Sequence, residues 1–303
     1  MASLRAFECL VALIDAGSVT QAAAKLHMSQ PALSHQIAAI ERELGTAVVE
    51  RLARGVRPTA AGLAVVEEAR TAIAAAERAI DVGKATGLGK GGRIRIVCAE
   101  TMTAWLLVPV LRQWRKQRPD VELDLSEHTS ADRMIRVLET GGADIAICPR
   151  PTATNANLEV LGREEMVVVS SLEHRFSRRR SIPPAELALE PFVHYKEDNG
   201  NAVWVDQFVA RHGVVLNPVL RTRSPRTAAQ LAAAGMGVTI APFSALSPRP
   251  GGAIRSLDPV ILRDVVVVIA SPRDALVRRF ALDLHRRGLP NSMLSQDRSD
   301  ADL

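Results

Sequence analysis

The chain has 303 residues, of which 47% are hydrophobic and 23% are charged, a composition that excludes a disordered protein and is enough for about two domains. No apolar run reaches the roughly 20 residues that cross a bilayer, so we expect no membrane partner. The net charge of +5 permits nucleic-acid binding, while an aromatic content of 3% disfavours a single-strand or RNA binder that stacks bases.

Cysteine usage and catalytic motifs both argue against familiar kinds of chemical site. Cys9, Cys98 and Cys148 lie far apart without a CxxC pair, so we expect neither a disulfide scaffold nor a thiolate metal site. The sequence shows no export signal, no nucleophile elbow, no Walker loop and no paired carboxylates in a catalytic context. We therefore expect a soluble cytoplasmic protein that is not an enzyme and has no catalytic residue, metal or cofactor.

The first 62 residues predict a helix-turn-helix. Apolar residues at three- and four-residue spacing mark a first helix that ends at Gly17, and a second short helix follows. Ser29 is a natural N-cap for a third helix, which has Pro31 in its first turn and ends at Gly45. Two short helices joined by a tight turn and leaning on a first one form this motif.

The outward face of the third predicted helix indicates DNA binding. Gln30, Ser34, His35 and Gln36 place uncharged donors and acceptors in its first turn and a half. A recognition helix reads base edges with its N-terminal residues, and amide side chains can pair with adenine. The alternative is a solvated face, which would normally carry Glu and Lys, as the far end of this helix does with Glu41 and its neighbours.

Two short extended stretches after this helix predict a wing. Arg54 lies beside Gly55 at its expected tip, where it can enter the minor groove or pair with phosphate. Arg51 can contact DNA or, as readily, brace the domain. Residues 1–62 carry six basic and five acidic side chains, a balance of +1, so we expect DNA binding to need at least two copies.

Residues 63–92 predict a dimerisation helix followed by a hinge. The alanine-rich stretch repeats apolar residues near seven-residue spacing, which forms one stripe able to pack on an identical helix. The alternative is that the stripe packs on its own winged domain, as we expect for Leu63. Five of the ten residues from Gly83 to Gly92 are glycine, too many for a helix, so we interpret this stretch as the hinge.

The remaining chain, residues 93–303, alternates predicted strands and helices. Strands over 93–99, 121–127 and 143–148 with helices between them predict a parallel sheet. A similar set follows, with strands over 166–170, 192–195, 219–222 and 238–241, before a last buried strand over 265–270 and a helix over 274–287. This pattern is typical of an α/β domain with two lobes.

Ligands of such folds sit beyond the carboxyl ends of the strands, where several loops carry hydroxyl groups. Capping of helices alone explains each hydroxyl, but together with free N–H groups at helix N-termini and an arginine they indicate an anion site. We therefore expect a small effector with a carboxylate or similar anion. The expected effector-binding residues are Thr101, Met102, Thr103, Thr129, Ser130, Arg150, His194, Arg223 and Ser224.

The sequence from Ser29 to Gly62 resembles the LysR-type transcriptional regulators. The similarity rests on an ordered motif: Ser29-Gln30-Pro31-Ala32-Leu33-Ser34, Gln36-Ile37, Ile40-Glu41, Leu44-Gly45, Arg51, Arg54 and Thr59-Ala60-Ala61-Gly62. Val49 departs from it, because the family usually has phenylalanine there, which should thin the packing behind the wing. The motif gives the expected DNA-binding residues Ser29, Gln30, Pro31, Ser34, Gln36, Arg51 and Arg54, and His35 joins them from its place on the outward face of the third predicted helix.

The resemblance implies an N-terminal winged helix-turn-helix, a long linker helix and a two-lobed domain that folds like periplasmic binding proteins. Lobe I would then comprise about 93–160 and 265–290, and lobe II about 161–264, with two crossings between them. We expect duplex DNA, a small effector and further copies of the chain (a homodimer or tetramer) as partners, with RNA polymerase as another. Two alternatives are an enzyme or solute-binding protein built on the lobes, and a nucleoid protein without sequence preference.

Overall fold

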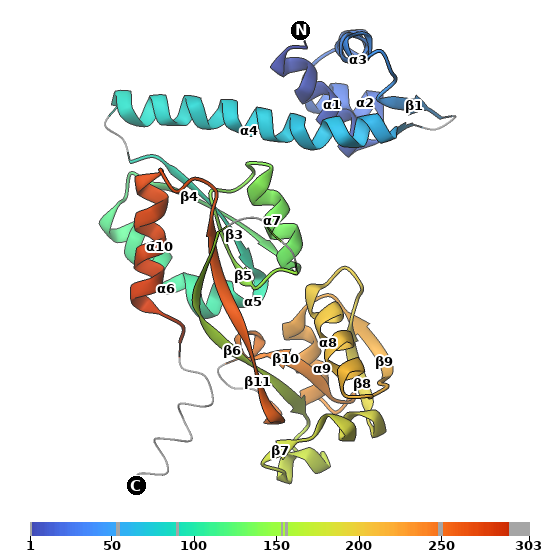
Figure 1. Cartoon of the computed structure of the whole chain (residues 1–303), viewed down its shortest axis with the longest axis vertical. Coiled ribbons are helices and arrows are strands. Elements are labelled where there is room, and N and C mark those ends of the chain that lie inside the picture. The colour runs from blue at the N-terminus through green and yellow to red at the C-terminus, as the bar shows by residue number, and fades with distance from the viewer. Residues whose placement is uncertain are drawn as a thin grey trace. The chain divides into compact units, whose positions relative to one another are not determined.

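The computed structural model describes residues 2–52, 55–88, 91–152, 154, 157–247 and 251–290 (Figure 1). The chain divides into two units, one of residues 1–92 with the short segment 139–143, and one of residues 93–138 and 144–303. We call them the winged unit and the effector unit. Across the described residues, no helix is both long enough and apolar enough to cross a membrane.

The winged unit has the predicted helices and wing. Its elements are α1 (Leu4–Ala16), α2 (Val19–Lys25), α3 (Gln30–Leu44), β1 (Val49–Arg51), β2 (Val56–Pro58) and α4 (Ala60–Leu88). Ser29 caps α3 by accepting a hydrogen bond from the Ala32 N–H at 3.3 Å, as predicted. Gly17 and Gly45 end α1 and α3 at φ angles of 62° and 67°, which only glycine adopts without strain. The local capping signals therefore place these helices correctly.

The core of the winged unit lies between α1 and the inner face of α3. Leu33, Ile37 and Ile40 of α3 are buried, as their spacing predicts. Leu44, which the same spacing places inward, is 44% exposed because it is the last residue of α3. Burial of the first three side chains fixes which face of α3 remains free.

The long helix α4 packs on its own unit through part of its apolar stripe. Val66 and Ala69 are buried, and Arg70 forms an ion pair with Asp15 of α1. Leu63, which we expected to be covered there, is 53% exposed instead. The helix also continues to Leu88, so the hinge prediction is wrong for residues 83–88. Gly83, the first of the five glycines in this stretch, does not end the helix.

The main sheet of the effector unit has the strand order β10-β6-β11-β5-β3-β4. Its strands are β3 (Arg93–Ala99), β4 (Glu122–His128), β5 (Ile145–Pro149), β6 (Leu158–Ser170), β10 (Thr239–Pro242) and β11 (Ala253–Ile269), with β7 (Ser181–Ile182) beside β11. The strands β4, β3 and β5 run parallel, as predicted, whereas β11 is antiparallel to both β5 and β6.

Two long strands connect the lobes. β6 and β11 run side by side from lobe I into lobe II, and their pairing extends on both sides of Glu164 and Arg263 (Figure 1). The predicted strands 166–170 and 265–270 are thus only the apolar ends of much longer strands. The charged residues in the middle interrupt the apolar pattern, but they face each other across the pair at matched register, Arg263 opposite Glu164.

Helices cover both lobes. In lobe I they are α5 (Glu100–Met102), a π-helical turn (Thr103–Leu107), α6 (Val108–Gln117), α7 (Ala131–Glu139) and α10 (Ala275–Arg287). Lobe II holds 3₁₀ turns over Arg175–Arg178, Pro184–Leu189 and Phe243–Ala245, a parallel pair of strands β8 (Pro191–Tyr195) and β9 (Asn217–Thr222), and the helices α8 (Gly200–Arg211) and α9 (Pro225–Ala233). Trp114 packs edge-on against Phe280 in lobe I, and the buried Tyr195 hydroxyl donates to the Ile240 carbonyl in lobe II.

Candidate DNA-binding surface and effector cleft

The N-terminal end of α3 presents free polar side chains. Gln30 and His35 are exposed, while Ser34 and Gln36 are half-buried. None of these four side chains forms a hydrogen bond with another described residue, whereas Ser29 is held by its capping role. Pro31 is exposed in the first turn, as predicted. The surface is therefore available to a partner, because the opposite face of α3 already anchors it to the core.

The wing is attached to the helices beside this surface. Val56 donates its N–H to the Gly17 carbonyl at 2.9 Å, which joins β2 to the turn between α1 and α2. Arg57 pairs with Glu50 across the two strands at 2.7 Å. Arg51 ends β1 opposite Val56, and Arg54, at the expected tip, lies outside the described residues.

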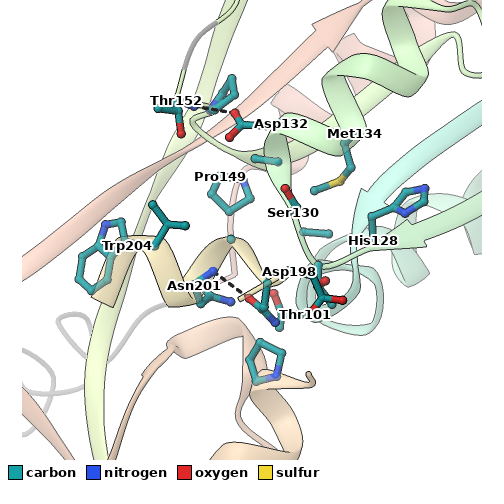
Figure 2. A pocket seen from close by; sticks show the side chains of 18 of the residues that line it. Thr101, His128, Ser130, Asp132, Met134, Pro149, Thr152, Asp198, Asn201 and Trp204 are labelled. Atoms are coloured by element: carbon teal, nitrogen blue, oxygen red, sulfur yellow. Dashed lines mark hydrogen bonds between the residues drawn. The ribbon is translucent and has the colours of Figure 1, made fainter. Parts of the chain in front are cut away.

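A cavity of about 270 Å³ opens beyond the carboxyl ends of β3, β4 and β5 (Figure 2). It lies between the lobes, because its walls also include the first residues of α8 and α9 from lobe II. The lining residues used below are Glu100, Thr101, His128, Thr129, Ser130, Asp132, Pro149, Arg150, Glu197, Asp198, Asn201, Trp204 and Arg263. This is the position that the strand order predicts for a ligand.

Four of the nine expected effector residues line this cavity, namely Thr101, Thr129, Ser130 and Arg150. Ser130 caps α7 by accepting a hydrogen bond from the Arg133 N–H, as expected. The cap expected from Thr101 or Thr103 is wrong, because the helical stretch begins earlier, at Glu100, with Ala99 in the N-cap position. Thr101 is instead 5% exposed and accepts a hydrogen bond from the Ser244 hydroxyl at 3.0 Å.

The other five expected residues lie outside the cavity lining. Met102 is fully buried in lobe I, and Thr103 belongs to the π-helical turn. His194 is 1% exposed and contacts Asp206 at 3.0 Å within lobe II. Arg223 is 72% exposed and pairs with Asp198, and the Ser224 hydroxyl donates to Glu100 at 2.8 Å. His194, Arg223 and Ser224 therefore have structural partners that strand position alone did not reveal.

Both arginines of the cavity are already paired with carboxylates. Arg150 contacts Asp264 at 2.8 Å. Arg263 contacts the fully buried Glu164 at 2.7 Å and donates to the Asn201 side-chain oxygen at the same distance. Sequence reasoning missed Arg263 and Asn201. The signal that could have found Arg263 was its place two residues before a predicted buried strand.

A buried polar network links the cavity to the strands that cross between lobes. Ser244 of lobe II donates its hydroxyl to Thr101 and its N–H to Glu164, at 3.0 and 3.4 Å. Glu164 holds Arg263, and Arg263 holds Asn201 at the start of α8. A ligand that moves Thr101 or Asn201 therefore acts directly on the crossing strands.

His128, at the end of β4, lines the cavity and makes the stability of the folded protein depend on pH. Burial, together with nearby Arg133, lowers the pKa of His128 below its ordinary value of 6.5. As the pH falls, the unfolded chain therefore binds a proton at His128 before the folded protein does. The stability that the neutral His128 side chain contributes is complete above pH 6.5 and is lost as the pH falls toward the lowered pKa. We expect the melting temperature of His128→Asn to fall less than that of the wild type across this window. An identical fall in both proteins would contradict the lowered pKa of His128.

The cysteines are buried thiols. Cys9, Cys98 and Cys148 are all buried, as expected for Cys98 and Cys148. Burial raises the pKa of the Cys148 thiol to about 12, with the nearby Asp132 adding to the effect, and it raises the pKa of Cys98 as well. Protonated thiols react poorly with oxidants and metals. Within the described part of the chain, no group of three or more metal-ligating side chains could hold an ion.

Two family models match the chain, one for each unit. The model for bacterial regulatory helix-turn-helix proteins of the lysR family matches residues 4–63, and the LysR substrate binding domain matches residues 88–287. The chain belongs to the LysR family. It is a DNA-binding transcriptional regulator with an effector-binding domain, which confirms the predicted fold class and function. The relatives found are likewise regulators rather than enzymes.

Individual relatives agree with this assignment. The regulator AlsR of Bacillus subtilis is 29% identical over 80% of this LysR-type chain and 81% of its own length. CbbR of Xanthobacter flavus is 32% identical, over 76% of the chain and 69% of its own length. The structure of full-length CbnR in complex with its target DNA matches 94% of the chain and 99% of its own, at 21% identity and a TM-score of 0.67.

Proposed function

We propose that this regulator reads its operator with the N-terminal edge of α3 and responds to a small carboxylate-bearing effector in the cleft between the lobes. The observation that carries the DNA-binding half is the set of unpaired side chains at Gln30, Ser34, His35 and Gln36. Uncharged groups in the first turns of a recognition helix suit base edges, and the neighbouring wing, with Arg51 and Arg54, suits the DNA backbone or minor groove.

Dimerisation through α4 would complete the DNA-binding form. Leu63 and Ile80 of this helix are 53% and 59% exposed, so part of the apolar stripe stays uncovered in one copy. A twofold dimer would place two α3 helices on a nearly palindromic operator. As a DNA-binding regulator it would work in the cytoplasm, with RNA polymerase as a further partner.

The effector half of the proposal rests on the cavity. The N-termini of α7, α8 and α9 meet there, and backbone N–H groups at helix N-termini favour an anion. Binding would change the angle between the lobes through β6 and β11, and with it the spacing of the paired winged units. A melting-temperature screen with small carboxylates tests this half, and the absence of any shift would count against it.

Gln30→Ala tests the DNA-binding half. We expect the variant to lose about 1–3 kcal/mol of binding free energy on the operator and little on random duplex, because only a base contact distinguishes the two. Fluorescence anisotropy at several salt concentrations measures both affinities. Gln113→Ala, which truncates an exposed glutamine on α6, is the matched control. An equal loss on both duplexes would rule out base reading by Gln30.

A further inference from the structure

The charges that line the cleft are unbalanced. Four carboxylates line the cavity, those of Glu100, Asp132, Glu197 and Asp198. The cations that line it are Arg150 and Arg263, and each is neutralised by a carboxylate that is not part of the lining, Asp264 or Glu164. His128 adds no charge near neutral pH, because its pKa is lowered. No lining cation is therefore free to neutralise an anionic ligand, among the residues that the structure describes.

The carboxylates, in contrast, have few cationic partners. Asp132 accepts a hydrogen bond from the Thr152 N–H at 2.8 Å, and Glu100 accepts one from the Ser224 hydroxyl, but neither donor is a cation. Glu197 is exposed and has no partner in the described part of the chain. Asp198 pairs with Arg223 in a pair that is mostly solvent-exposed and hence weak. These carboxylates come from both lobes, so the cleft carries negative charge that its lining cations do not neutralise.

Asn201 marks a different kind of subsite. Its side chain is 7% exposed and lines the cavity. Arg263 can only donate hydrogen bonds, so the atom that faces it must be the Asn201 oxygen, which leaves the amide nitrogen without an acceptor among the described residues. This nitrogen keeps contact with the solvent of the cavity, so it can donate a hydrogen bond to an acceptor on a ligand. Thr101 adds a second donor, because its oxygen accepts from Ser244 and its own proton remains available.

Asp132 and Asn201 lie on different walls of the cavity. Asp132 comes from α7 of lobe I and Asn201 from α8 of lobe II. In Figure 2 Pro149 lies between Asp132 above and Asn201 below, with the ring of Trp204 to one side. Trp204 is half-buried and stacks on Phe208 at 5.3 Å, so its ring is held as a fixed wall. Asp132 and Asn201 line the same cavity of about 270 Å³, which is the space that a small ligand would occupy.

We propose that the effector is a zwitterion, an α-amino acid or a related amino carboxylate. Its carboxylate binds Asn201 and Thr101 near the helix N-termini, and its ammonium group binds Asp132. A plain carboxylate would leave Asp132 unneutralised beside it, and a plain amine would leave the Asn201 donor unpaired. This inference rests on the proposed effector function of the cleft and narrows its ligand class.

The test uses matched ligands on the full-length protein. The twenty L-amino acids are screened by melting temperature, and each that shifts it is compared by calorimetry with the acid lacking its amino group and the amine lacking its carboxylate. For L-phenylalanine these are 3-phenylpropionate and 2-phenylethylamine. We expect one or a few amino acids to bind at least about tenfold more tightly than either counterpart.

Asp132→Asn tests the subsite itself. This variant keeps an oxygen for the Thr152 N–H but removes the charge, so we expect the preference for the amino acid over its deaminated counterpart to disappear. Asp120→Asn removes an exposed carboxylate outside the cavity and should leave the preference intact. If deaminated acids bind as tightly as amino acids, the zwitterion inference falls while the carboxylate effector stands. If plain acids and amino acids all fail to bind a folded, DNA-binding protein, both fall and DNA binding remains.

Discussion

Replacing Glu164 with alanine is expected to destabilise the effector unit by about 3–5 kcal/mol, because it leaves the Arg263 charge buried without a partner. Glu164 is fully buried and the Arg263 side chain is 10% exposed, so water cannot replace the lost carboxylate. Chemical unfolding of the full chain, followed by circular dichroism, measures the change. Asp264→Ala, at the next position of β11, removes the partner of the half-exposed Arg150 and should cost about 1 kcal/mol or less.

A double variant separates charge burial from packing. Replacing both Glu164 and Arg263 with methionine removes the two charges together, so we expect most of the lost stability to return. The same double variant should respond poorly to effector, because Asn201 loses the group that orients its amide. Equal losses of stability in Glu164→Ala and Asp264→Ala would show that burial of the Glu164–Arg263 pair is not the main cause of the destabilisation.

Gly62→Ala is expected to destabilise the winged unit by about 3 kcal/mol and to weaken DNA binding. A Cβ at this position would lie 1.9 Å from the Val48 carbonyl oxygen, and backbone atoms cannot move aside as a flexible side chain does. Thr59, the residue before α4, joins this helix to the start of the wing, because it donates its N–H to the Val48 carbonyl and its hydroxyl to the Ala47 carbonyl. Thermal melting and operator binding measure the two effects.

Gly83→Ala is the matched control in the same helix. A Cβ at Gly83 meets no atom within 4 Å, so the substitution should stabilise α4 by up to about 1 kcal/mol through helix propensity alone. Similar behaviour of the two variants would show that propensity outweighs the contact with Val48. Opposite signs of the change in stability would show that glycine is required at position 62 for steric reasons and is not required at position 83.

Local signals in the sequence were sufficient for the winged unit. Ser29 and Gly45 mark the ends of α3 by capping chemistry, and Leu33, Ile37 and Ile40 mark its buried face by spacing. Each of these depends only on neighbours along the chain. The exposure of Leu63 was not predictable in this way, because it depends on which face of α4 meets α1.

The cleft was harder to predict because its chemistry depends on pairs distant in sequence. The loops after β3, β4 and β5 could be placed from strand order, and Thr101, Thr129, Ser130 and Arg150 do line the cavity. The partners of Glu164 and Arg150 lie about a hundred residues further along, and no local pattern links them. Arg263 therefore looked like an interruption in a strand, although it is the cation at the centre of the network.

The course of β11 has a consequence for how the protein is made. The strand β5, buried except at its last residue, pairs with β3 on one side and β11 on the other, yet β11 follows the whole of lobe II in the chain. As the polypeptide leaves the ribosome, the hydrogen-bonding edge of β5 stays open until the last portion has been synthesised. A nascent chain that stalls before Val265 would display an apolar edge suited to chaperone capture or aggregation.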